Sequence, residues 1–81
     1  MNDDTVDNAI LYLVEASGAG KSISPAEVAQ MLDPENWRSR LGAIKQSATR
    51  LALAGKVDIL RKGKPVDPSE FKGVYRITLK T

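Results

Sequence analysis

Residues 36–55 place the strongest constraint on the fold, because their apolar side chains repeat with the period of an α-helix. Successive apolar residues are separated by four, three, four and three positions, which aligns them along one face of a helix with 3.6 residues per turn. These residues are Trp37, Leu41, Ile44, Ala48 and Leu51. The pattern predicts one helix over residues 36–54 that packs on a core through this face, with Trp37 as its largest anchor. Gly55 is the expected C-terminal glycine.

The remaining surface of this helix is polar and basic, and residues 36–55 contain no acid. At about 100° per residue, the positions opposite the apolar face are Ser39, Ala43, Gln46 and Arg50, and those along one flank are Arg38, Lys45 and Thr49. We therefore expect the helix to present this surface to a partner.

Charge is divided unevenly along the 81 residues, although the net charge is only +2. Residues 1–36 carry a net charge of −6, residues 37–64 a net charge of +7, and residues 65–81 a net charge of +1. Such asymmetry favours a polyanionic partner. The alternative interpretation is that the acidic and basic segments simply neutralise each other in the fold.

Composition indicates one ordinary soluble domain and excludes several chemistries. The apolar fraction is 42% and the charged fraction 27%, as in typical globular proteins. The sequence has no apolar run of membrane length and no charged-then-apolar leader, so we expect a cytoplasmic protein without a membrane span. It contains neither Cys nor His, so we expect no disulfide, no metal site of the usual zinc type, no cofactor and no Ser–His or Cys–His catalytic pair. We therefore do not expect an enzyme.

Two shorter helices are predicted before residue 36. Apolar residues at positions 6, 9, 10, 13 and 14 predict a helix over residues 5–17, capped by Asp3 or Asp4 and broken by residues 18–20. Residues 22–23 are expected to form a short extended segment. Ser24, Pro25 and Glu27 then form a capping box that predicts a helix over residues 25–33.

The C-terminal part predicts two strands joined by a long basic loop. Residues 57–62 and 73–79 are the strands, and the second places Tyr75, Ile77 and Leu79 on one face. The loop between them contains two prolines. The resulting order is helix, short strand, helix, helix, strand, loop, strand. This order indicates an α+β winged helix-turn-helix domain spanning residues 1–81, in which residues 36–54 are the recognition helix and the hairpin is the wing.

Three segments carry a resemblance to a known family. They are G-K-S-I-S-P-A-E-V-A (Gly20–Ala29), R-K-G-K-P-V-D-P (Arg61–Pro68) and F-K-G-V-Y-R (Phe71–Arg76). They resemble segments of a small bacterial single-domain family of unknown function. The resemblance implies a winged-helix fold and brings no activity or catalytic residue, so function must be inferred from the surface.

The recognition helix and the wing together predict binding to nucleic acid, most specifically to duplex DNA. Lys and Arg side chains neutralise phosphates, and Gln, Thr and Arg can contact base edges in the major groove. The predicted binding residues are Arg38, Lys45, Gln46, Thr49, Arg50, Arg61, Lys62, Lys64 and Lys72. RNA is a variant of this hypothesis. Without an exposed aromatic platform, duplex DNA is favoured over single strands.

The alternative function is a protein-interaction or dimerisation module that does not bind nucleic acid. An exposed Leu53 with an exposed Phe71 would form the apolar centre of such an interface. Two outcomes remain open for each residue: the hairpin covers Leu53 or leaves it exposed, and Phe71 folds under the wing or faces a partner. Tyr12 and Tyr75 are expected to be packed, and Asp67 is expected to form a turn before Pro68.

Overall fold

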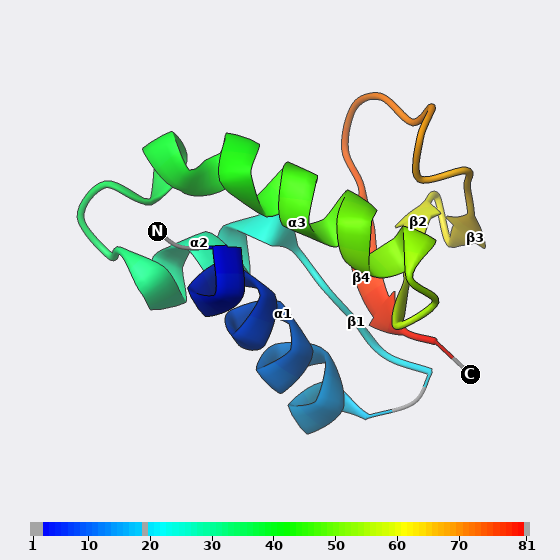
Figure 1. The fold of residues 1–81 in the computed structure, drawn as a ribbon, viewed down its shortest axis with the longest axis horizontal. Coiled ribbons are helices and arrows are strands. Elements are labelled where there is room, and N and C mark those ends of the chain that lie inside the picture. Colours follow the sequence, from blue (N-terminus) through cyan, green and yellow to red (C-terminus); the bar gives the residue numbers. More distant parts are fainter. Residues whose placement is uncertain (1–2, 19, 81) are drawn as a thin grey trace.

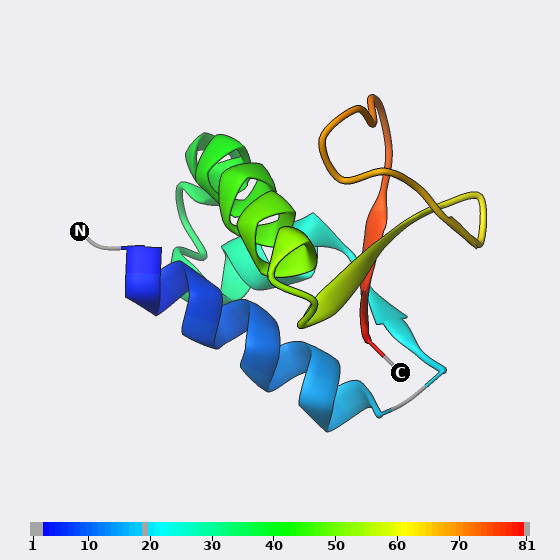
Figure 2. The same cartoon turned by 45° about the vertical axis from the view of Figure 1, so that its right-hand side comes forward.

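In the part of the chain that the structure describes, three α-helices lie on one side of a small antiparallel sheet (Figure 1; Figure 2). The computed structural model describes residues 3–18 and 20–80. In this part of the chain the helices are α1 (Asp3–Ser17), α2 (Pro25–Leu32) and α3 (Leu41–Leu53), with a 3₁₀ helix η1 (Trp37–Arg40) before α3. The strands are β1 (Ser22–Ile23), β2 (Val57–Arg61), β3 (Lys64–Pro65) and β4 (Arg76–Leu79). Their order in the sheet is β1-β4-β2-β3. The predicted α+β class is confirmed.

The core lies between the helices and the inner face of the sheet. Three isoleucines form a row across neighbouring strands, because Ile77 of β4 pairs with Ile23 of β1 on one side and with Ile59 of β2 on the other. All three are at most 1% exposed. Ile10 of α1, Val28 of α2 and Ile44 of α3 are fully buried opposite this row. Each element therefore contributes one apolar face, as the spacing along each helix predicts.

Helix α1 buries the predicted face but begins earlier, at Asp3 rather than residue 5. Ala9, Ile10 and Val14 are buried. The expected packing of Tyr12 is wrong, because its side chain is 65% exposed. Tyr12 lies two positions from both Ile10 and Val14, which places it about 200° away from each around the helix. The side chains of Asp3 and Asp4, the expected caps, lie outside the described residues.

Helix α2 has the predicted capping box at its start. The Ser24 hydroxyl accepts a hydrogen bond from the Glu27 backbone N–H at 3.2 Å, and the Ser24 N–H donates to the Glu27 carboxylate at 2.8 Å. The helix ends at Leu32, one residue earlier than predicted. Asp33 then forms the turn that follows, because its carboxylate accepts from the Asn36 N–H at 3.1 Å and from Arg40 Nε at 3.3 Å.

The predicted single helix over residues 36–54 is wrong in its first turn, which is the 3₁₀ helix η1. Ser39 tightens this turn, because both its N–H (3.0 Å) and its hydroxyl (2.7 Å) donate to the Asn36 carbonyl. A 3₁₀ turn advances about 120° per residue rather than 100°, so Trp37 leaves the line of the apolar face. It is half-buried and packs at the edge of the core, and Ile44, Ala48 and Leu51 are the buried residues of that face.

Helix α3 ends as predicted at a glycine. Gly55 has φ +80°. Its N–H donates to the Ala52 carbonyl, and the Lys56 N–H donates to the Leu51 carbonyl, both at 3.0 Å. This is the Schellman arrangement that closes helix C-termini.

The two glycines of this region should respond in opposite ways to alanine. Gly55→Ala should lower the free energy of unfolding by about 1–2 kcal/mol, because alanine disfavours the left-handed region. Gly42→Ala should raise it by up to about 1 kcal/mol, because Gly42 lies inside α3 and alanine is the better helix former. A Cβ at either position meets no atom within 4 Å, so packing does not complicate the comparison. Urea denaturation measures both changes. Equal destabilisation by the two variants would contradict the positive φ of Gly55 and the helical conformation of Gly42.

The wing differs from the prediction in having a tight turn and a third strand. β2 ends at Arg61, and Lys62-Gly63 forms a two-residue turn in which both residues have positive φ, 54° and 81°. This is the turn type that suits a two-residue hairpin. It allows β3 to pair with β2 in a segment predicted to be loop. Proline is acceptable at residue 65 because β3 is an edge strand.

The last strand, β4, begins at Arg76 and not at the predicted residue 73. Gly73 has φ +84°, which interrupts the extended chain. The predicted inward face is nevertheless correct, because Tyr75 and Ile77 are buried and Leu79 is half-buried.

Candidate nucleic-acid interface

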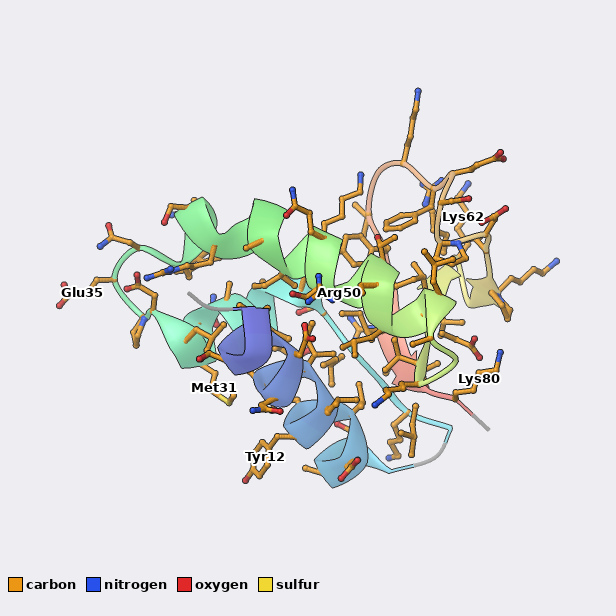
Figure 3. All side chains as sticks on the ribbon, viewed as in Figure 1. Tyr12, Met31, Glu35, Arg50, Lys62 and Lys80 are labelled. Atoms are coloured by element: carbon orange, nitrogen blue, oxygen red, sulfur yellow. The ribbon has the colours of Figure 1, made fainter. Side chains whose placement is uncertain are left out.

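The wing consists of the β2–β3 hairpin and the segment from residue 66 to residue 75, which returns to β4 (Figure 1). The hairpin turn exposes Lys62 and Lys64 to solvent, and Figure 3 shows Lys62 at this side of the molecule. Asp67 forms the predicted turn, since its carboxylate accepts from the Ser69 N–H at 2.9 Å and the Ser69 hydroxyl at 2.7 Å. These two hydrogen bonds lower the pKa of the Asp67 carboxyl group.

Phe71 holds the returning segment of the wing against the body of the protein. Of the two outcomes for this residue, the structure shows the buried one, with 8% of the side chain exposed. Its ring meets Tyr75 edge-on, with centroids 4.9 Å apart and an angle of 62° between the planes. Lys72, directly after Phe71, is exposed. The aromatic pair thus positions one basic side chain of the wing.

Arg61 stabilises the wing from within. Its Nε donates to the Val74 carbonyl at 2.9 Å, which gives this carbonyl a partner where pairing between β2 and β4 has ended. Arg61 Nη2 lies only 3.0 Å from the position that a Cβ on Gly73 would occupy. The predicted DNA contact from Arg61 therefore competes with a structural role within the wing.

Helix α3 turns one basic flank towards the wing. Lys45 Nζ lies 5.0 Å from the centroid of the Phe71 ring, within range of a cation–π interaction. Arg38, on the preceding η1, stacks over Trp37 with 4.5 Å between the guanidinium carbon and the ring centroid. Gln46 is exposed, and Thr49 is half-buried with its hydroxyl donating to the Lys45 carbonyl at 2.8 Å.

Arg50 lies on the other flank of α3, next to α1 (Figure 3). Its Nη2 donates to the Asp7 carboxylate at 2.6 Å and to the Ser47 hydroxyl at 3.3 Å. Ser47 is 2% exposed, a burial that the helical period did not predict. Arg50 therefore joins α3 to α1 and is separated from the wing-facing flank.

The basic residues other than Arg61 divide into two groups by whether a carboxylate lies within 4 Å. Four form ion pairs within 4 Å: Arg40 with Asp33, Arg50 with Asp7, Arg76 with Glu27 and Lys80 with Asp58. Within the described residues, five of the predicted basic binding residues have no carboxylate partner at this distance and are exposed: Arg38, Lys45, Lys62, Lys64 and Lys72. In the same part of the chain, Lys21 and Lys56 also lack such a partner, and they lie at the end of the sheet opposite the β2–β3 turn.

Two features were missed by the sequence interpretation. Val74 is 85% exposed, and next to it a groove runs between the wing, α2 and α3. The sequence signal for the groove was Gly42. An isolated glycine within a helical pattern lowers stability, so its presence indicates a packing or functional reason.

Leu53 is 67% exposed, so the hairpin does not cover it.

The helices and sheet define a small α+β fold whose arrangement is compatible with a winged helix. Residues 3–80 match a family described as "Protein of unknown function (DUF3253)". The match spans nearly the whole chain, and the chain belongs to this family. The resemblance to a family of unknown function is thus confirmed. No curated protein matches the sequence.

Two features are absent from the described residues, 3–18 and 20–80. No helix among them is long and apolar enough to cross a bilayer. No group of three or more His, Cys, Asp or Glu side chains among them is arranged to hold a metal ion.

Proposed function

We propose that this chain is a winged-helix domain that binds duplex DNA through α3 and the wing. The observation that carries the proposal is the separation of the basic residues. Ion pairs hold Arg40, Arg50, Arg76 and Lys80. Among the residues that the structure describes, the exposed cations without a carboxylate partner within 4 Å include all three lysines of the wing. Phosphate contacts by Lys and Arg supply most of the affinity of such surfaces for DNA.

The geometry supports base contacts by α3 and phosphate or minor-groove contacts by the wing. Gln46 is exposed on α3, and within the described residues its side chain has no hydrogen-bond partner. It is therefore available for an adenine edge in the major groove, which admits an α-helix. Lys62 and Lys64 at the hairpin turn would contact the phosphates beside that groove or enter the minor groove. A cytoplasmic location, where bacterial DNA lies, accords with this function.

The alternative, a protein-interaction or dimerisation module, has lost one of its two supports. Phe71 is buried and so is not part of an exposed apolar centre. Leu53 remains exposed, but a single exposed leucine is ordinary on a protein surface. DNA binding is therefore the better-supported function, and RNA remains a variant to be tested beside it.

Titration of labelled protein with duplex DNA, single-stranded DNA and structured RNA at two salt concentrations tests the proposal. We expect weak binding that favours the duplex and shifts the amide signals of α3 and the wing. If about three to five phosphates are neutralised, log affinity should fall against log salt with a slope of about −3 to −4.5. Absence of binding at low salt would contradict the proposal and favour the interaction module.

Gln46 and Arg50 should differ in their effect on sequence preference. Gln46→Ala should reduce discrimination between sites, with a loss of about 1–3 kcal/mol for a bidentate base contact, and should leave the salt slope unchanged. Arg50→Ala should leave discrimination unchanged, because its guanidinium is bound to Asp7 beside α1. Anisotropy titrations against a randomised duplex pool and selected sites measure both effects. If Arg50→Ala alone lost discrimination between sites, Arg50 and not Gln46 would be the residue that contacts bases.

A further inference from the structure

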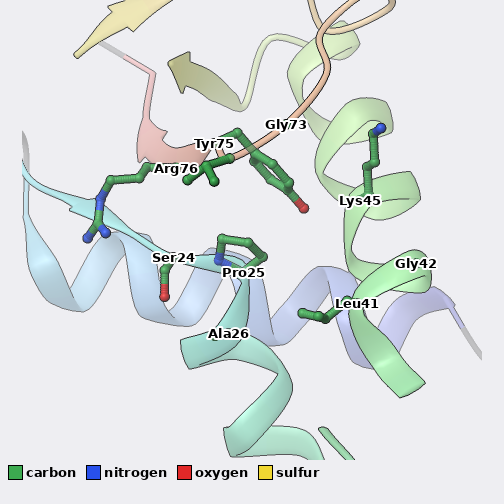
Figure 4. Close-up of a pocket in the computed structure, with 10 residues that line it drawn as sticks. Ser24, Pro25, Ala26, Leu41, Gly42, Lys45, Gly73, Tyr75 and Arg76 are labelled. Atoms are coloured by element: carbon green, nitrogen blue, oxygen red, sulfur yellow. The ribbon is translucent and has the colours of Figure 1, made fainter. Parts of the chain in front are cut away.

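An apolar groove opens between the start of α2, the first turns of α3 and the segment that leads into β4 (Figure 4). Its volume is about 680 Å³, within the range of roughly 300–1,000 Å³ that is typical of small-molecule sites. Its lining includes Pro25, Ala26, Leu41, Gly42, Val74 and Tyr75. Of the described residues, ten line it and none of these is acidic.

Gly42 helps to keep this groove open. A Cβ at this position would meet no atom within 4 Å, so the space beside the helix is unfilled. Glycine in a helix costs about 1 kcal/mol relative to alanine. The chain therefore carries a destabilising residue at a place where any longer side chain would project into the groove.

Tyr75 lines the groove, and its hydroxyl is a covered polar atom beside it. Its hydroxyl is buried and is the one side-chain polar atom of the described residues that is both buried and without a hydrogen-bond partner. Figure 4 shows it pointing between Pro25 and α3. Burial raises the pKa of Tyr75 to about 12, so the group stays protonated at neutral pH and acts as a donor. Leaving a buried donor unsatisfied is unfavourable, and a ligand with an acceptor would relieve this cost.

Lys45 supplies positive charge at the mouth of the groove. It lines the groove from α3, and its Nζ lies 5.0 Å from the Phe71 ring on the wing side. Arg76 also lines the groove, but its guanidinium turns towards β1, where it donates to the Ser22 hydroxyl and carbonyl. The groove thus has apolar walls, a covered donor beside it and the Lys45 ammonium at its mouth, which together favour an acceptor that is also an anion.

We propose that this groove binds a small amphipathic carboxylate. The apolar body of the ligand would lie against Pro25, Leu41 and Val74, and its carboxylate would accept a hydrogen bond from the Tyr75 hydroxyl close to Lys45. Because the hydroxyl is covered, binding includes a side-chain movement that uncovers it. The proposal goes beyond DNA binding and does not depend on it.

Titration of labelled protein with 3-phenylpropionate, in the absence of nucleic acid, tests this site by NMR. We expect saturable shifts of the Ala26, Gly42, Gly73 and Val74 amides with a Kd of about 1–10 mM, as suits a ligand of this size. The matched neutral compound, 3-phenylpropanol, should bind about tenfold more weakly, because it lacks the charge that faces Lys45.

Three variants separate the parts of the site. Tyr75→Phe removes only the hydroxyl and should weaken carboxylate binding about tenfold. Gly42→Leu should weaken binding because its side chain projects into the groove, and Gly42→Ala is its control, because a methyl group leaves most of the space. Leucine and alanine are both good helix formers and position 42 is exposed, so both Gly42 variants should fold.

Several outcomes would overturn the proposal. These are no saturable shifts, equal affinity for the carboxylate and the alcohol, or full carboxylate binding by Gly42→Leu. Shifts of the groove amides that depend on protein concentration without added compound would show instead that a second copy of the chain covers the groove.

Discussion

Leu51→Ala should lower the free energy of unfolding by about 2–5 kcal/mol, the range for truncating a buried leucine. Leu51 is 5% exposed and packs in the core cluster. A domain of 81 residues has a total stability of roughly 4–12 kcal/mol at the usual value per residue. The variant should therefore lose a large fraction of its stability and unfold partly at 37 °C.

Leu53→Ala is the matched control, because it makes the same substitution on the same helix two residues later. Leu53 is 67% exposed, so its truncation should change the free energy of unfolding by no more than about 0.5 kcal/mol. Urea denaturation followed by circular dichroism compares the midpoints of the two variants at similar slope. Similar losses at both positions would mean that Leu53 is covered in solution, and an interface on this face of α3 would then have to be considered.

Local features of the fold were predictable from the sequence because their causes are local. The buried face of α3 follows from the spacing of Ile44, Ala48 and Leu51, and the start of α2 follows from the Ser24 capping box. The end of α3 follows from Gly55. In each case the residues that determine the structure lie within one or two turns of it.

The errors have causes that lie farther away or in a subtler conformational choice. β3 depends on a lysine that adopts φ 54° before Gly63, a conformation that favours Gly, Asn or Asp in most turns. Trp37 departs from the apolar face of α3 because hydrogen bonds to the Asn36 carbonyl tighten the turn before this helix. Neither choice changes the hydrophobic pattern, so periodicity cannot detect it.

In the candidate site, the sequence shows the charge of each residue but not the group that each residue contacts. Sequence identifies all nine polar or basic positions equally, but it does not show which of them are held by other groups. Arg50 is held by Asp7, 43 positions earlier, and Arg61 by the Val74 carbonyl, 13 positions later. These long-range contacts divide the predicted residues into a structural part and an exposed part. The exposed part is the surface to which the DNA proposal now applies.

Replacing Lys62, Lys64 and Lys72 together by alanine should remove most of the salt dependence of DNA binding. All three are exposed on the wing, and within the described residues none has a carboxylate partner within 4 Å. If each contacts one phosphate, the slope of log affinity against log salt should become less negative by about 2.7. The fold should be retained, because none of the three packs in the core.

A charge-matched control distinguishes a local surface from a general effect of net charge. The triple variant Lys21→Ala, Lys56→Ala, Lys80→Ala also removes three positive charges. These charges lie at the opposite end of the sheet, where the Lys80 N–H donates to the Lys56 carbonyl. It should keep the wild-type slope. Fluorescence anisotropy from low to physiological salt measures both variants. Equal flattening by the two would mean that DNA responds only to net charge, and an unchanged slope in the wing variant would leave these lysines as solvated charges with no part in binding.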